Sequence, residues 1–184
     1  EAKRWDLAQS HYRYNYSLQE ECDSIMFHGF EHSFPQSEVT GTERLKYHED
    51  KPWSKNIAHY HYYEAGDSIE IPAYYIVGGQ NTRLINHLRL NGVEMTELTE
   101  FETKTAGAYR ILKFETGEKP YEGHFLHRNI LKEDTGLSVL LKKGDVLVRT
   151  DQKNRRFILS VLTPDAPDSY FAWNFFDSYV QQKE

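Results

Sequence analysis

The spacing of apolar residues changes most clearly at residues 73–98, which read AYYIVGGQNTRLINHLRLNGVEMTEL. Residues 73–77 are a short run of β-formers that ends at two glycines. Asn81 or Thr82 can cap a helix, and a helical apolar face follows: Leu84, Ile85, Leu88 and Leu90. Gly92 is the type of residue that follows a helix C-terminus. Residues 93–98 alternate again, so the stretch predicts a strand–helix–strand unit with its two strands paired in parallel.

Downstream of this unit the sequence has the pattern of short strands. Alternating runs are separated by glycines or by the polar stretch 152–156, and they occur at 108–114, 124–131, 137–141, 145–150 and 157–162. Short strands at such regular spacing are typical of an antiparallel β-sandwich or barrel.

The last segment, 168–182, has the pattern of an amphipathic helix. Asp168 or Ser169 can cap it after two prolines, and aromatic residues follow at helical spacing. We expect this C-terminal aromatic helix to bury Trp173 against the sheets, so that Trp173→Ala costs roughly 3–5 kcal/mol.

The upstream part is less regular. Residues 1–20 predict a short helix, from the spacing of Trp5, Ala8 and Tyr12, that runs into a strand. Two further strands are expected at 25–34 and 57–63, separated by a long polar loop at 36–56 and followed by a turn at 65–67. The fold class is therefore α+β: a mostly antiparallel β-sandwich with the small strand–helix–strand unit near 73–98, in a single domain over 1–184.

Composition excludes some classes of function. The chain has 184 residues, of which 22 are basic and 28 are acidic, for a net charge of −6. Its dense basic groups are Lys142-Lys143 and 153–156, the second of which we interpret as a hairpin tip. Phosphate neutralisation needs a clustered basic surface, so we expect no nucleic-acid partner. No apolar run reaches the roughly 20 residues of a membrane span. The single cysteine, Cys22, lies among acidic residues, which disfavours a reactive thiolate.

The most suggestive metal motif is His28-Gly29-Phe30-Glu31-His32, which fits the H-x-x-E-H spacing of one class of zinc peptidase. That chemistry needs both imidazoles on one face of a helix. The surrounding residues instead favour a strand, in which Glu31 points away from His28 and His32. We therefore assign no metal ligand here.

A second histidine pair is His59 and His61, which would share one face of a strand. Paired imidazoles on a β-scaffold can hold a metal if further ligands converge, and the candidates are Glu64, His124 and His127. The alternative is a simple alternation of Tyr and His on a strand with one face exposed to solvent.

Three weaker patterns could form an acid–base pair, an anion site or a sugar-binding surface. Glu122 and His124 could act as acid and base, although a turn at Gly123 that leads into a strand explains them better. Gly78-Gly79-Gln80 lies between a strand and a helix, where anions often bind, but it lacks the dinucleotide and P-loop fingerprints. Exposed rings could form a sugar-binding platform, and the candidates are Trp53, Tyr60, Tyr62 and Tyr63. We predict no catalytic, cofactor-binding or metal-binding residue within this chain.

An ordered set of segments resembles the region downstream of the catalytic domain in bacterial zinc carboxypeptidases. The segments are 37–41 (SEVTG), 72–77 (PAYYIV), 88–93 (LRLNGV), 120–124 (PYEGH), 143–148 (KGDVLV), 150–152 (TDQ), 167–177 (PDSYFAWNFFD) and 182–184 (QKE). The resemblance covers roughly residues 25–184. The chain departs from the pattern at Thr163-Pro164, where a Glu-Pro is expected.

The resemblance implies a non-catalytic accessory domain that supports or orients a catalytic domain or its substrate. In that family, zinc is held on a separate N-terminal peptidase domain, so zinc is expected in the parent enzyme and no cofactor in this fragment. The implied partners are that peptidase domain and a peptide or glycan ligand, in a secreted or periplasmic setting. The alternatives are a carbohydrate- or peptidoglycan-binding β-sandwich and a metal-dependent hydrolase built on the histidine cluster.

Overall fold

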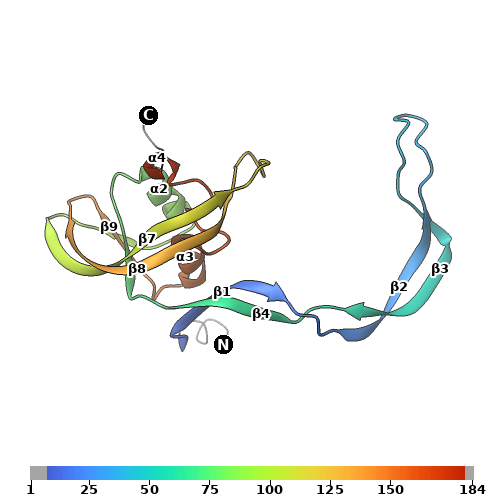
Figure 1. Cartoon of the computed structure of the whole chain (residues 1–184), viewed down its shortest axis with the longest axis horizontal. Helices are drawn as coiled ribbons and strands as arrows, with labels where there is room; N and C mark the ends of the chain where they lie inside the picture. The colour runs from blue at the N-terminus through green and yellow to red at the C-terminus, as the bar shows by residue number, and fades with distance from the viewer. Residues whose placement is uncertain (1–7, 181–184) are drawn as a thin grey trace. The chain divides into compact units, whose positions relative to one another are not determined.

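The computed structural model describes residues 8–180, which form two compact units (Figure 1). We call residues 16–65 the arm and the remaining described residues, 8–15 and 66–180, the body. Strands make up 50% of the structure and helices 13%, and the strand pairs are mostly antiparallel, so the α+β class is confirmed. The single domain over 1–184 stays a prediction, and Trp5 of the expected N-terminal helix lies outside the described residues.

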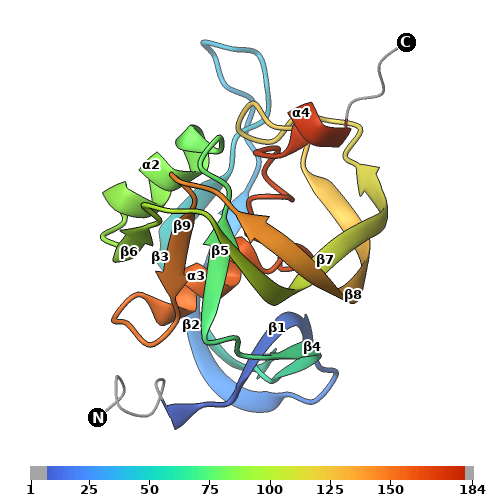
Figure 2. The same ribbon diagram turned by 90° about the vertical axis from the view of Figure 1, so that its left-hand side faces the viewer.

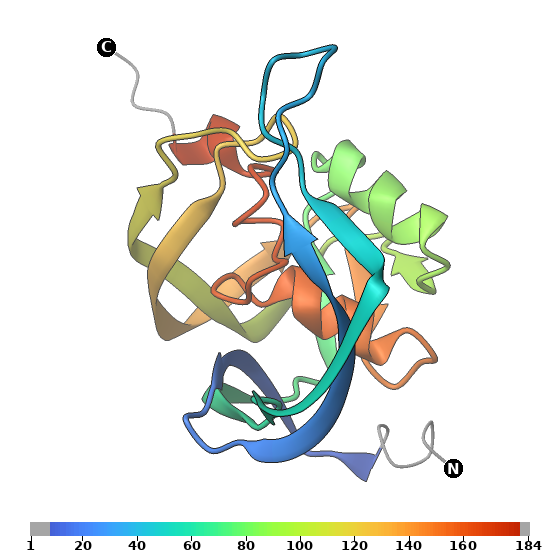
Figure 3. The same ribbon diagram turned by 90° about the vertical axis from the view of Figure 1, so that its right-hand side faces the viewer.

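The arm is built on a long ribbon of two antiparallel strands, β2 (Asp23–Ser33) and β3 (Lys46–His59), which twists strongly along its length (Figure 3). The register shifts at a bulge between Phe30 and Glu31. The strand expected at 25–34 is confirmed, whereas the expected loop at 36–56 is wrong because β3 begins at Lys46. Both faces of a two-stranded ribbon can be exposed to solvent. β3 therefore does not need the alternation of apolar and polar residues from which a strand is predicted.

Two strands pair with each other at the junction of the units: β1 (His11–Leu18) and β4 (Tyr63–Glu70). The strand expected before residue 20 is therefore confirmed. The turn expected at 65–67 is wrong, because these residues lie inside β4. A Cβ on Gly66 would lie 3.0 Å from the carbonyl oxygen of Asn15. The glycine therefore marks a close approach of two backbones and not a chain reversal.

The body contains the predicted strand–helix–strand unit, formed by β5 (Tyr74–Val77), α2 (Thr82–Leu90) and β6 (Met95–Glu97). The parallel pairing is wrong, because β9 (Val146–Arg149) lies between β5 and β6 and is antiparallel to both. The helix packs through Leu84, Ile85 and Leu88 into the core of this three-stranded sheet.

A second, two-stranded ribbon joins β7 (Glu102–Thr116) to β8 (His127–Leu141). The runs predicted as separate strands at 124–131 and 137–141 belong largely to the one strand β8. Gly136, which we expected to separate them, lies inside β8 opposite Gly107. No atom lies within 4 Å of a Cβ built on either glycine, so the ribbon has open space on both strands at this point.

The strand predicted at 157–162 is a helix, α3 (Arg155–Leu162), so this prediction is wrong. Its buried residues Ile158, Leu159 and Val161 fit a helical face as well as a strand, and contact with the core decides between them. The hairpin tip predicted at 153–156 is wrong as well, because α3 begins within it. Arg155 begins the helix, is buried, and donates from its guanidinium to the carbonyl oxygen of Gln9 at 2.9 Å.

The long helix predicted at 168–182 is also wrong, since among residues 168–180 only α4 (Asp177–Val180) is helical. Ser169 does act as a local cap, because its Oγ accepts from the backbone N–H of Ala172 at 3.0 Å and donates to the carbonyl oxygen of Pro164 at 2.6 Å. Tyr170, Phe171 and Ala172 are buried in succession. Three consecutive buried residues cannot share one face of a helix, so packing around the irregular chain replaces the expected stripe.

Candidate binding cleft

A cleft of about 1020 Å³ lies within the body. One wall is β5, the opposite wall is the β7–β8 ribbon, and Phe171, Phe176, Tyr179 and Val180 contribute further lining. Figure 2 shows β5 between β9 on one side and the β7–β8 ribbon on the other. Ligand sites typically occupy roughly 300–1,000 Å³, so this cleft is large enough for a substantial ligand.

The lining of the cleft is mostly apolar and rich in rings. Six aromatic side chains contribute to it: Tyr74, Tyr75, Tyr109, Phe171, Phe176 and Tyr179. Aromatic rings offer large apolar faces, and the tyrosine hydroxyls add polar groups at defined points. This combination suits a ligand with apolar side groups and a polar frame.

Two of these tyrosines sit against a polar cluster. Burial raises the pKa of Tyr75, whose hydroxyl lies 3.3 Å from Oγ1 of Thr163, and burial also raises the pKa of Tyr109. Lys132 Nζ lies 4.2 Å from the centre of the Tyr109 ring and 3.4 Å from Oδ1 of Asp165. Both phenols therefore stay protonated near neutral pH and act as hydrogen-bonding groups in the cleft wall.

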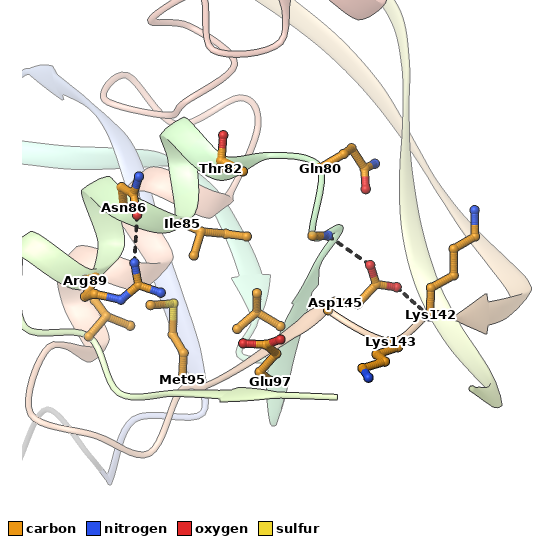
Figure 4. A pocket seen from close by; sticks show the side chains of 14 residues that line it. Gln80, Thr82, Ile85, Asn86, Arg89, Met95, Glu97, Lys142, Lys143 and Asp145 are labelled. Carbon is orange, nitrogen blue, oxygen red and sulfur yellow. Dashed lines mark hydrogen bonds between the residues drawn. The ribbon is translucent and has the colours of Figure 1, made fainter. Parts of the chain in front are cut away.

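A second cleft, of about 680 Å³, lies between α2 and the loop from Lys142 to Asp145 (Figure 4). It contains Gly79 and Gln80, where the sequence suggested an anion site. The backbone N–H of Gly79 donates to Oδ1 of Asp145 at 2.9 Å, and the N–H of Lys142 donates to Oδ2 of the same carboxylate at 2.8 Å. A carboxylate of the protein itself thus takes the position of an anion at this loop, which argues against a phosphate there.

The H-x-x-E-H motif lies on β2, as the sequence analysis expected. His28 Nδ1 lies 2.7 Å from Oγ of Ser54, on the neighbouring strand β3. Glu31 follows the bulge, and its Oε2 pairs with Lys51 Nζ at 3.5 Å. His28 and Glu31 therefore each have a partner across the ribbon, the ring of His32 contacts Phe34, and the spacing does not bring the three side chains together as ligands.

The second histidine pair does come together. The rings of His59 and His61 are stacked, with their centres 4.6 Å apart. His61 Nε2 lies 3.3 Å from Oδ2 of Asp23, which also accepts from the hydroxyl of Tyr62 at 3.1 Å. Among residues 8–180, no group of three His, Cys, Asp or Glu side chains is arranged to hold a metal ion. Glu64 belongs to the arm, whereas His124 and His127 belong to the body.

The Tyr121–His124 segment is a tight turn. Its two end residues exchange backbone hydrogen bonds of 2.8 and 2.9 Å, and Glu122 and Gly123 have φ values of 48° and 79°. Two residues with positive φ are the mark of a type I′ hairpin turn. The turn explains the spacing of Glu122 and His124 without an acid–base role.

The sequence analysis missed a contact made by His127. This side chain is buried, with its Nε2 2.9 Å from Oδ1 of Asp177 and its Nδ1 3.1 Å from Oγ1 of Thr116. The histidine therefore links β8 to β7 and to the start of α4. No local pattern connects residues that lie 50 positions apart, so the sequence carries no signal for this pair.

The four residues of the predicted sugar-binding platform differ in their exposure to solvent. Tyr60, Tyr62 and Tyr63 are exposed, whereas Trp53 is half-buried and packs over Gly29 beside Phe27. Cys22 is exposed as well. Three of the four candidate rings, all tyrosines of the arm, are thus open to solvent.

Comparisons of the chain with protein-family models, with curated proteins and with solved structures find no match. Within residues 8–180, none of the helices has the length and apolar character needed to cross a membrane.

Proposed function

We propose that this chain is an accessory binding domain that holds a peptide ligand in the cleft of the body. The observation that carries the proposal is the cleft itself: about 1020 Å³, with one wall from β5, the other from the β7–β8 ribbon, and a mostly apolar aromatic lining. Such clefts with a few convergent polar groups are the usual sites of ligand binding.

The polar groups in the cleft are suited to binding rather than to covalent chemistry. The phenols of Tyr75 and Tyr109 have raised pKa values because they are buried, so neither becomes a phenolate near neutral pH. The Asp145 carboxylate accepts two backbone N–H groups and is committed to the loop that it holds. The two phenols can donate and accept hydrogen bonds to orient a bound chain.

The resemblance to the downstream region of bacterial zinc carboxypeptidases supports a peptide as the ligand. A domain next to a peptidase would bind its substrate or a segment of the peptidase itself, and zinc would belong to that catalytic domain. The same resemblance is the basis for proposing a secreted or periplasmic enzyme as the parent. We also propose that the sheets pack as a β-sandwich, which the antiparallel pairing within each sheet supports.

The test is to block the cleft and measure peptide retention. Gly107 lines the cleft, shares a strand face with Tyr109, and has open space around a Cβ, so Gly107→Trp fills the cleft without a backbone clash. Leu90→Trp adds the same ring at a position that is 86% exposed and outside the cleft, and serves as the matched control. The probe is a tryptic digest of reduced, unfolded serum albumin, passed over each immobilised protein.

We expect the wild-type protein and Leu90→Trp to retain the same subset of peptides, identified by mass spectrometry, and Gly107→Trp to lose it. Equal melting temperatures of the two variants would show that both are folded. A wild-type protein that retains no peptide, or a Gly107→Trp variant that retains the same peptides, would overturn the proposal.

A second candidate function is glycan binding by the arm, which the exposure of Tyr60, Tyr62 and Tyr63 favours. Rings that are open to solvent can stack on sugar faces. Titration with soluble peptidoglycan fragments should then change the protein fluorescence, and replacement of all three tyrosines by alanine should abolish the change. A wild-type protein without a response would remove this candidate.

A further inference from the structure

We propose that the peptide binds as an added β-strand along the free edge of β5. This inference rests on the proposed function, because it specifies how the cleft of the body recognises its ligand. The ligand class is an extended polypeptide segment whose backbone pairs with β5 and whose alternate side chains contact the aromatic lining.

The backbone groups of β5 point alternately toward β9 and away from it. The N–H of Thr150 donates to the carbonyl oxygen of Ala73 at 3.1 Å, next to the antiparallel pairing of β5 with β9. In an antiparallel pair, alternate residues direct their backbone groups toward the partner. Ala73, Tyr75 and Val77 therefore face β9, whereas Tyr74 and Ile76 direct their N–H and C=O groups to the other side.

The edge of β5 that faces away from β9 borders the cleft. Within residues 8–180, β9 is the only strand that pairs with β5, so the opposite edge has no strand on it. All residues from 72 to 78 line the cleft. A strand that presented only one face would contribute every second residue, so the continuous lining shows that the edge of β5 borders the cleft. The free groups of Tyr74 and Ile76 thus point toward it.

The opposite wall of the cleft, formed by β7, is also lined by consecutive residues. Residues 105–109 of β7 also line the cleft without a break. Three of them are small, and Gly107 has no atom within 4 Å of a built Cβ. Longer side chains do connect the two walls: Lys104 Nζ lies 5.9 Å from the centre of the Tyr74 ring, and the side chains of Tyr75 and Tyr109 share a hydrogen bond. The flexible lysine can move aside, and the small residues opposite then leave room for a chain beside Tyr74 and Ile76, whose side chains lie on the other face of β5 from that of Tyr75.

An unpaired edge is a template for another strand. Natural proteins protect exposed edges with charged residues, proline or bulges, and β5 (Tyr-Tyr-Ile-Val) contains none of these. Backbone groups that recur every second residue match the repeat of an extended peptide and not that of a sugar chain or an acyl chain. Strand addition, with apolar contacts from alternate side chains, is a known mode of peptide recognition.

The test removes one backbone donor from the edge and leaves the side of the strand that faces β9 intact. Ile76→Pro deletes the N–H that points into the cleft, and proline is tolerated on an edge when that N–H is not part of the ladder. Ile76→Val keeps the N–H and is the matched control. The probe is one synthetic peptide chosen from those that the wild-type protein retains, together with versions N-methylated at each single backbone position.

We expect Ile76→Pro to weaken peptide binding by about tenfold or more, and Ile76→Val to change it by less than about threefold, in titration calorimetry. N-methylation should weaken binding at alternate positions of the peptide and leave the positions between them unaffected. Unchanged melting temperatures would show that Ile76→Pro keeps its fold. If that variant unfolds, the N-methyl series on the wild-type protein gives the answer alone.

The two proposals fail in different ways. If peptides bind and Gly107→Trp abolishes the binding, but neither Ile76→Pro nor N-methylation weakens it, strand addition is wrong and the binding cleft stands. If no peptide is retained at all, the proposed function is wrong as well.

Discussion

At the scale of single residues, the crowding of backbone atoms decides where glycine is required. A Cβ at Gly79 would collide with the carbonyl group of Gly144, in the loop where Asp145 binds the Gly79 N–H. A Cβ at Gly107 would meet no atom within 4 Å. The same residue type therefore has a steric role at one position and leaves room in the cleft at the other.

This contrast gives a matched pair of substitutions. We predict that Gly79→Ala lowers the free energy of unfolding by about 1–3 kcal/mol, because two backbone segments must move apart. Gly107→Ala should change it by less than about 0.5 kcal/mol. Chemical denaturation of the two variants measures both values, and equal losses would contradict the steric explanation.

The buried imidazole of His127 gives a second prediction at this scale. His127→Ala removes hydrogen bonds to Asp177 and Thr116, and we expect a loss of about 1–3 kcal/mol in unfolding free energy. His28→Ala, which removes an exposed side chain from β2, is the comparison and should cost less than about 0.5 kcal/mol. Similar losses for both substitutions would show that the contact with α4 does not stabilise the fold.

At the scale of secondary-structure elements, the C-terminal segment packs through consecutive side chains instead of a helical stripe. Phe171 is buried beside Phe114 and His127, with ring centres 5.2 and 5.3 Å away. Trp173 is only half-buried and contacts the turn residues Tyr121 and His124. The anchor of this segment is therefore Phe171, not the tryptophan that the sequence analysis expected.

We accordingly predict that Phe171→Ala lowers the free energy of unfolding by about 3–5 kcal/mol. Trp173→Ala should cost less, because part of its ring is already in water and a smaller area returns to solvent. Urea denaturation of both variants gives the order directly. A larger loss for Trp173 would restore the original expectation.

The elements that sequence analysis predicted correctly have a local signal. For α2, a capping position, an apolar face and a terminal glycine all lie within a dozen residues, and β9 is a β-branched run between a glycine and polar residues. The failures depend on distant partners: β9 inserts between β5 and β6, and contact with the core makes 155–162 a helix. In the candidate site, the β5 strand was predictable, but its free edge was not. That edge depends on which strands pair, and local patterns do not encode pairing.

At the scale of the whole molecule, buried phenols link stability to alkaline pH. Burial raises the pKa of Tyr75 and of Tyr170 above the ordinary value of 10.0, and burial together with Asp165 does the same for Tyr14. Above pH 10 the unfolded chain loses these protons while the folded chain keeps them. The unfolded chain then binds fewer protons than the folded chain, so a rise in pH favours unfolding. The free energy of unfolding that is present below pH 10 therefore decreases as the pH rises.

We predict a decrease of the unfolding free energy between pH 10 and 11.5 that is less steep in Tyr75→Phe. Each phenol that stays protonated only in the folded state contributes up to about 1.4 kcal/mol per pH unit. Tyr63→Phe, at an exposed position of the arm, should leave the slope unchanged. Urea titrations at several pH values measure the slopes, and identical slopes in all three proteins would contradict the role assigned to Tyr75.

The most direct measurement is hydrogen exchange of the individual β5 amides by NMR, with and without a peptide that the wild-type protein retains. If the peptide adds to β5, the amides of Tyr74 and Ile76 should exchange about tenfold more slowly or slower still in its presence, because they gain acceptors. The amide of Asn86, in the middle of α2, should be unaffected. Exchange at Tyr74 and Ile76 that stays the same when the peptide saturates the protein would contradict strand addition in this cleft.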